Sequence, residues 1–177
     1  FCLSGHYSKP IDYSEELLTE NLTKWRQIET CYYELIHADN KKHDNEIKST
    51  VRKISDEFDE GLESDFNTHL ALLVFFKLVK EVNYLAAEEK LGLNDVKNVM
   101  PEFERMLEIL GLRVPKTTED EKKEIDDLIM DRVHLRKEKK FQEADKIRDK
   151  LNEMNVELID HKEKTIWVRK EKIRGEN

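Results

Sequence analysis

The most apolar stretch of the chain is LALLVFFKLVKEVNYLAA, residues 70–87. Placed on an α-helix, its apolar residues almost encircle the axis, and a helix of that kind is buried at the centre of a fold. Thr68, two residues before the stretch, is a predicted N-cap. We therefore expect residues 70–87 to form the central helix of the fold.

Two amphipathic segments precede this central helix. The first is predicted to be a helix over residues 15–37, because Ser14 is a favoured N-cap and apolar residues recur at helical spacing. Residues 38–45 are polar and are predicted to be a loop. A second helix is expected to begin near Ile47 and to stop near Gly61. Each of these helices has one apolar face that can cover residues 70–87.

A fourth helix is expected to follow. Pro101 suits the first position of a helix, and Gly111 suits the residue just after its end. Four helices with short connections favour an antiparallel bundle over residues 15–111. Residues 1–14 lead into this bundle, and residues 112–118 form a predicted linker.

Beyond the linker, two more helices are predicted. Thr118 and Glu121 form a capping box for a helix that runs to about residue 138. A short basic turn at residues 139–141 leads into the second helix, whose buried side has Ala144 and Leu151. Asn155 is the expected left-handed residue after it.

The apolar period then changes to two, which is typical of strands. The alternating residues are Val156, Leu158, Ile166 and Val168, on either side of a turn at residues 161–164. Residues 170–177 look like a basic, frayed tail. The expected fold is mostly α: an antiparallel helical bundle followed by a small module of two helices and a β-hairpin over residues 119–177.

The composition excludes several classes of protein. Five Gly and three Pro are too few for a many-stranded sandwich or barrel, while 40% of the residues are charged. The longest apolar run is far shorter than the ~18 residues of a membrane-spanning helix. Cys2 and Cys31 show no disulfide or zinc spacing. These features favour a soluble, cytoplasmic protein without a membrane partner.

Motifs for autonomous catalysis are missing from the sequence. It has no Walker loop, GxGxxG, HExxH or GxSxG, and its six histidines never approach a second metal-type ligand at convincing spacing. We therefore expect no catalytic residue, no metal site and no cofactor in this chain.

The charge is distributed unevenly. Residues 1–112 have 13 basic and 22 acidic side chains, whereas residues 113–177 have 18 and 17. Within the second part, residues 132–150 have eight basic and four acidic side chains. By charge alone such a run is more often a solvated helix face than a nucleic-acid surface.

One arrangement inside this run has two interpretations. Asp145 and Arg148 lie three residues apart, on the helix face opposite Ala144. An Arg held by an Asp would present a fixed fork to a base edge, with Phe141 and Trp167 stacking on bases. Alternatively, the two form an ordinary intrahelical ion pair, Phe141 staples the helix start and Trp167 caps the hairpin. Spacing alone favours the ion pair.

Three segments add a resemblance. Residues 3–14, LSGHYSKPIDYS, resemble the segment that follows the KMSKS loop in cysteinyl-tRNA synthetases, and residues 64–68, SDFNT, are similar to that family's DDFNT signature. Residues 136–151, RKEKKFQEADKIRDKL, resemble the start of the family's tail. Residues 156–160 and 165–167 are similar to its terminal hairpin. The segments occur in the family's order.

The resemblance implies a DALR-type bundle over residues 15–111 and an anticodon-binding module over residues 119–177. The positions that match the family's contacts to the GCA anticodon of cysteine tRNA are Arg136, Phe141, Asp145, Arg148 and Asp160, with Trp167 at the terminal hairpin. The candidates for contacts to the tRNA backbone are Lys137, Lys139 and Lys140.

The resemblance also implies that the chain is the carboxy-terminal piece of a monomeric cysteine–tRNA ligase. ATP and zinc would then be bound by an amino-terminal catalytic core, which is a second expected partner besides the tRNA. The piece alone is expected to be inactive. Two alternatives stay open: the tail of a related class I cysteine ligase that acts on an aminosugar, and a non-catalytic helical module that binds protein.

Overall fold

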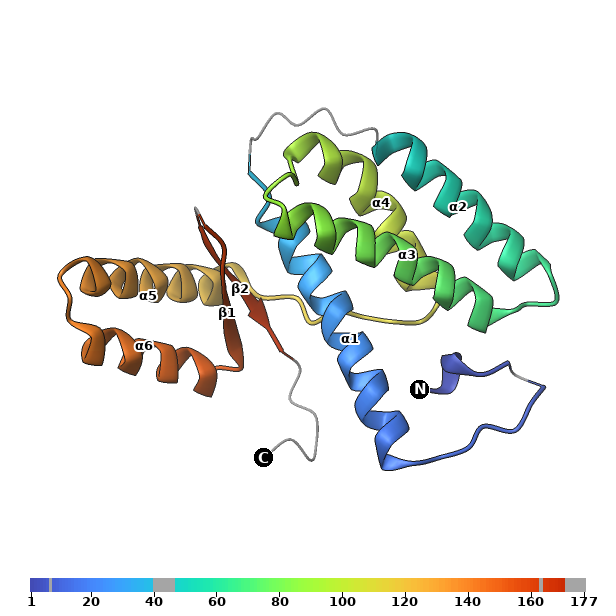
Figure 1. Ribbon diagram of the computed structural model, residues 1–177, viewed down its shortest axis with the longest axis horizontal. Helices are drawn as coiled ribbons and strands as arrows, with labels where there is room; N and C mark the ends of the chain where they lie inside the picture. Colours follow the sequence, from blue (N-terminus) through green and yellow to red (C-terminus); the bar gives the residue numbers. More distant parts are fainter. Residues whose placement is uncertain (7, 40–46, 163, 171–177) are drawn as a thin grey trace. The chain divides into compact units, whose positions relative to one another are not determined.

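The computed structural model describes residues 1–6, 8–39, 47–162 and 164–170. In this part of the chain there are six α-helices, one short 3-10 helix and a two-stranded antiparallel sheet, so the fold is mostly α as expected (Figure 1). The chain separates into two compact units, Phe1–Val114 and Pro115–Asn177. Most of the predicted loop at 38–45 and of the predicted tail at 170–177 lies outside the described residues.

The first unit is a helical bundle with α3 at its centre (Figure 1). Its elements are the 3-10 helix η1 (Cys2–Ser4), α1 (Glu15–Ile36), α2 (Ile47–Glu63), α3 (Thr68–Ala87) and α4 (Leu93–Ile109). Helix α3 contacts all the others, which confirms its predicted central place. Not all of its apolar residues are covered, however: Phe75 and Leu78 are fully buried, whereas Leu73 is 51% exposed.

Local signals set most of the helix ends in this unit. The hydroxyl of Ser14 accepts the N–H of Leu17 at 3.2 Å, so this predicted cap is confirmed. Gly111 has φ of +68° and follows the end of α4, also as predicted. The cap of α3 is Asn67 rather than Thr68, because the Asn67 side chain accepts the N–H of Leu70 at 3.0 Å.

The start of α4 differs from the prediction. The helix begins at Leu93, where the carboxylate of Asp95 accepts the N–H of Gly92 at 2.9 Å. Pro101 therefore lies inside the helix, where a missing N–H costs about 3 kcal/mol. Phe103 is fully buried and packs against Phe75 of α3, with ring centres 5.4 Å apart, so tertiary packing supports a helix that the sequence alone would interrupt.

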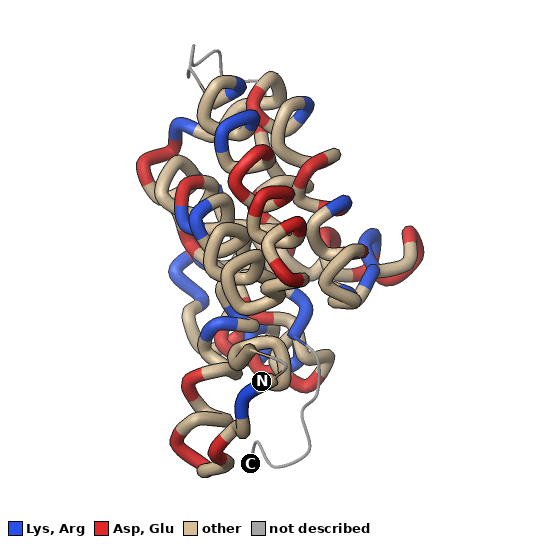
Figure 2. The backbone as a smooth tube through the Cα atoms, turned by 90° about the vertical axis from the view of Figure 1, so that its right-hand side faces the viewer, with Lys and Arg blue, Asp and Glu red and all other residues tan. Residues whose placement is uncertain are grey.

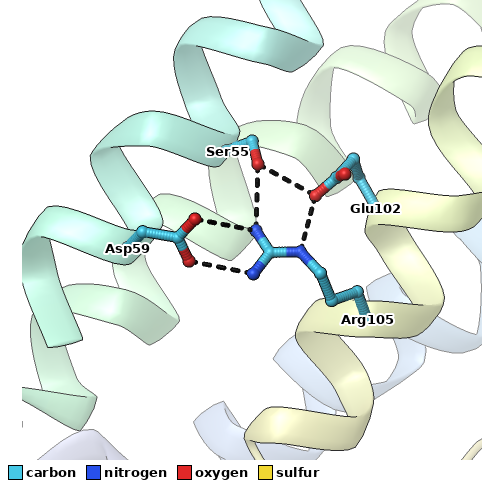
Figure 3. A network of polar contacts seen from close by, with 4 residues as sticks. All are labelled: Ser55, Asp59, Glu102 and Arg105. Carbon is cyan, nitrogen blue, oxygen red and sulfur yellow. Dashed lines mark hydrogen bonds and ion pairs between the residues drawn. The ribbon is translucent and has the colours of Figure 1, made fainter.

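A polar network joins α4 to α2 (Figure 3). The guanidinium of Arg105 donates to Asp59 Oδ1 at 2.9 Å, to Ser55 Oγ at 2.9 Å and to Glu102 Oε2 at 2.8 Å. The Ser55 hydroxyl in turn donates to Glu102 at 2.9 Å. The guanidinium also lies 5.6 Å from the ring centre of Phe58. One side chain thus connects acceptors of two helices with a buried aromatic ring.

Replacing Arg105 by alanine is expected to lower the free energy of unfolding by about 1–3 kcal/mol, because alanine can form neither the charge-assisted hydrogen bonds nor the cation–π interaction. The matched control is Lys77→Ala, which breaks the exposed ion pair of Lys77 with Glu57 and should lower the free energy of unfolding far less than Arg105→Ala. Urea unfolding followed by circular dichroism measures both variants. Equal destabilisation by the two changes would contradict the role given to the network.

The second unit has two helices and a hairpin (Figure 1). Its elements are α5 (Glu119–Lys137), α6 (Phe141–Glu153), β1 (Val156–Asp160) and β2 (Thr165–Arg169). Helices α5 and α6 pack against each other, and β1 pairs antiparallel with β2, with Leu158 opposite Trp167 and Asp160 opposite Thr165. Asn155 has φ of +59°, as expected for the residue after α6.

The hairpin is bound to α5 by three polar contacts. Arg169 pairs with Glu121 at 2.7 Å, Trp167 Nε1 donates to Asp126 at 2.9 Å, and Arg132 lies 3.4 Å from Asp160. These contacts change the burial pattern that the sequence predicts. Three successive residues of β2, from Ile166 to Val168, are buried rather than alternate ones. On α5 it is Arg132 that is buried, while its apolar neighbour Val133 is exposed.

The capping box of α5 predicts that the stability of the second unit depends on pH. Glu121 accepts a hydrogen bond from Arg169 and two from Thr118, which lower its pKa from 4.5 to about 2. A carboxylate with a lowered folded-state pKa stabilises the fold above its unfolded-state pKa, and this contribution is lost as the pH falls. We expect the melting temperature of this unit to fall between about pH 4.5 and pH 2 more steeply in the parent chain than in Glu121→Gln.

Glu119→Gln is the control for this pH series. Glu119 is exposed in the first turn of the same helix, and within the described residues it forms no ion pair. The control should follow the parent melting curve at each pH. Identical pH profiles for Glu121→Gln and the parent would contradict the prediction.

Candidate functional site

Positive charge gathers where α5 ends and α6 begins. In the bundle, by contrast, acidic and basic residues are interspersed on the helices (Figure 2). We call residues 137–140, which include Lys137, Lys139 and Lys140, the basic corner. Lys139 has φ of +61°, and Lys140 occupies the N-cap position of α6 without a side-chain cap. The chain therefore reverses direction here with lysines on the outside of the turn.

The basic corner borders a shallow hollow that holds an exposed aromatic ring. The residues that line the hollow are Lys139, Lys140, Phe141, Gln142, Glu143 and Lys146. Phe141 is 56% exposed, so one face of its ring can stack on a planar group. Lys140 pairs with Glu138 at 2.8 Å, which raises the pKa of Lys140 and lowers that of Glu138. Lys137 and Lys139 make no ion pair within the described part of the chain.

Asp145 and Arg148 lie on α6 as expected, but they do not pair. Both are exposed, whereas Ala144 and Leu151 are buried. Arg148, four residues after Ala144 and three before Leu151, lies beside this buried side of α6 rather than opposite it. Among the residues that the structure describes, neither side chain forms a hydrogen bond or ion pair. The prediction that Asp145 holds Arg148 is therefore wrong in both of its forms, the fixed fork and the ordinary ion pair. An exposed ion pair on a helix gains only about 0.3–0.5 kcal/mol, because water solvates both charged groups well when they are apart.

Asp160, at the end of β1, is an acceptor that two other side chains hold in place. Its Oδ1 accepts the hydroxyl of Thr165 at 2.6 Å, and its Oδ2 accepts Nη2 of Arg132 at 3.4 Å. The Thr165 hydrogen bond lowers the pKa of Asp160; burial opposes this, while the hydrogen bond and charge of Arg132 and the charge of Arg136 lower it further. Asp160 is thus an ionised acceptor, with the cation of Arg136 near it.

Trp167 lies in the core rather than on the surface. It is 1% exposed, and its indole N–H donates to Asp126 at 2.9 Å. A ring buried on this scale cannot stack on a base in this conformation. The alternative interpretation, in which Trp167 belongs to the hairpin's own packing, agrees with the structure.

The structure brings only some of the predicted site residues together. Arg136 and Asp160 interact electrostatically, and Phe141 adjoins the basic corner. No hydrogen bond or ion pair in the described part of the chain joins Asp145 or Arg148 to Asp160. The surface is therefore a set of separate exposed groups on a small unit, which suits an extended ligand better than a small molecule.

Two residues of this site were not found from the sequence. Thr165 and Arg132 hold Asp160, yet Arg132 was counted only as part of the basic run. Its spacing contained a signal, because Arg132 lies seven residues after the buried Ile125 and so falls on the same helix face. A charged residue on an apolar stripe indicates a buried partner.

No helix in the described part of the chain is both long and apolar enough to span a membrane. No group of three or more His, Cys, Asp or Glu side chains in that part of the chain could hold a metal ion.

Comparison with known proteins relates this chain to one family. Residues 57–114 match the DALR domain family. Over 97% of its length the chain is 34% identical to a protein named cysteine–tRNA ligase from Bacillus velezensis, and over 96% it is 35% identical to one of that name from Geobacillus thermodenitrificans. A third, from Exiguobacterium sp., is 31% identical over 96% of the chain. The chain spans 38%, 37% and 37% of these relatives, in their C-terminal parts.

Proposed function

We propose that this chain, which is similar to cysteine–tRNA ligases along almost its whole length, is the tRNA-binding C-terminal part of such an enzyme. The observation that carries the proposal is the second unit. There an Asp160 whose pKa is lowered in part by the charge of Arg136, an exposed Phe141 and a lysine-rich corner all belong to one small fold. These are the groups that reading of unpaired bases requires: an acceptor, a donor, a stacking surface and contacts for phosphates.

Each group has a distinct task in this proposal. The Asp160 carboxylate accepts hydrogen bonds from base amino groups, and Arg136 and Arg148 donate to base acceptors. Phe141 stacks on a base, a contact worth about 1–3 kcal/mol. Lys137 and Lys139 attract phosphates without regard to sequence. Asp145, exposed on the same helix as Arg148, is a further acceptor.

The complete enzyme is part of the proposal. In it, a catalytic core outside this chain activates cysteine with ATP and transfers it to cysteine tRNA, while this part orients the anticodon. ATP and zinc are assigned to that core. We also propose that the enzyme acts as a monomer in the cytoplasm and that this chain alone is inactive.

Binding of RNA tests the proposal directly. The 177-residue chain is titrated with a cysteine tRNA transcript and with a transcript of the same sequence whose GCA anticodon is replaced. We expect tighter binding of the first at a fixed salt concentration, since base readout adds to phosphate attraction. Equal affinities for the two transcripts would reject anticodon reading.

Both alternatives predict a result that differs from anticodon reading. The tail of a ligase that acts on an aminosugar has no use for RNA and should bind neither transcript at physiological salt. A protein-binding helical module should behave in the same way. The exposed Phe141 beside Lys139 favours RNA over both alternatives, because aromatic and cationic groups side by side are typical of surfaces for single-stranded nucleic acid.

A further inference from the structure

Arg132 is a buried cation with one carboxylate to balance it. Its side chain is 6% exposed, on the same face of α5 as the buried Ile125. Removing a guanidinium from water is costly unless a charged partner is present. Among the residues that the structure describes, Asp160 is the one carboxylate that pairs with it, at 3.4 Å. Arg132 thus places a positive charge, which is costly to remove from water, beneath the tip of the hairpin.

Asp160 is held from two sides. Thr165, its cross-strand neighbour, donates to one oxygen, and Arg132 from α5 donates to the other. An ionised carboxylate can accept about four hydrogen bonds, so two of its acceptor sites stay unused. The side chain is 53% exposed, so the carboxylate is accessible from solvent. The result is a fixed, charged acceptor that is open to an incoming donor.

We propose that Arg132 and Thr165 are positioning residues that hold the Asp160 carboxylate in place to accept the amino group of an anticodon base. This inference rests on the proposed function and adds two residues to it. A group that is fixed before binding loses less conformational entropy when the base arrives. The two hydrogen bonds also keep Asp160 ionised, and a protonated carboxyl group would lose acceptor capacity at one oxygen.

The first test uses RNA stem-loops that carry either the GCA anticodon or a replaced one, with the full chain as binder. Arg132→Gln should reduce the ratio of the two affinities by about five-fold or more, the lower end of what one base contact provides. In an Asp160→Asn background, Arg132→Gln should reduce the ratio no further, because it acts through Asp160. Arg169→Gln is the control: it breaks another contact between α5 and the hairpin, the pair with Glu121, and should leave the ratio unchanged.

The second test needs no RNA. The pKa of the Asp160 carboxyl group, followed by NMR, should rise in Arg132→Gln and in Thr165→Val, since each change removes a hydrogen bond to the ionised form. If Arg132→Gln fails to fold, Thr165→Val, which changes a residue at the hairpin tip, takes its place in both tests.

The outcomes separate the two proposals. An unchanged Asp160 pKa, or an equal loss in the Asp160→Asn background, overturns the positioning role while anticodon reading by the parent chain still stands. If the parent chain binds both stem-loops equally, anticodon reading falls and the positioning role falls with it. A raised pKa together with a coupled loss of discrimination supports both.

Discussion

Replacement of Trp167 by alanine is expected to unfold the second unit, residues 115–177, and to leave the helical bundle folded. The indole is 1% exposed and is the largest fully buried side chain of the chain's described part. Truncating a buried Trp typically costs about 3–5 kcal/mol. A unit of about 60 residues has a total stability of about 3–9 kcal/mol, so the change removes much or all of it.

Trp167→Phe separates packing from hydrogen bonding. The smaller ring keeps most of the buried contacts but gives up the indole N–H that donates to Asp126 at 2.9 Å. We expect a loss of about 1–3 kcal/mol, from the unpaired carboxylate and the reduced volume. Peptide-resolved hydrogen exchange distinguishes the units. Faster exchange should appear in α5, α6 and the hairpin of the alanine variant, and protection lost equally in α3 would contradict the independence of the two units.

The sequence predicted those helix ends that are set by local chemistry. Ser14 caps α1, Thr118 and Glu121 cap α5 reciprocally, and Asn155 follows α6 in the left-handed region, because each of these devices acts within a few residues. The prediction of where α4 starts was wrong for the opposite reason. Pro101 is a local helix-start signal, and its position inside the helix is tolerated because distant residues bury the same segment.

For the candidate site too, features within one helix could be predicted from the sequence, whereas contacts between elements could not. Arg148 is exposed as the sequence predicts, although it lies beside the buried residues Ala144 and Leu151 rather than opposite them. The contact of Arg132 with Asp160 joins residues 28 positions apart and exists only once the hairpin docks on α5. The buried position of Trp167 has the same origin. Periodicity along α5 can indicate that Arg132 has a buried partner, but it cannot identify that partner on another element.

Arg148→Ala is expected to weaken binding of an RNA with the GCA anticodon by about 1–3 kcal/mol and to reduce discrimination against a replaced anticodon. A guanidinium donates two parallel hydrogen bonds to a base edge, and methyl donates none. Folding stability should change by no more than about 0.5 kcal/mol, since Arg148 is exposed and, within the described residues, has no partner to lose.

Lys137→Ala is the control that separates readout of the bases from electrostatic attraction to the phosphates. Lys137 is exposed at the end of α5, and a contact of its ammonium group with phosphate would not depend on the bases. This variant should weaken the binding of both RNAs equally. It should also reduce the magnitude of the slope of log affinity against log salt by about 0.7 for each phosphate of single-stranded RNA that it no longer neutralises. Affinities for both RNAs at two salt concentrations, with thermal melts of each variant, measure the contrast. If Arg148→Ala leaves the ratio of the two affinities unchanged, Arg148 does not read the anticodon, and this face of α6 contributes charge alone.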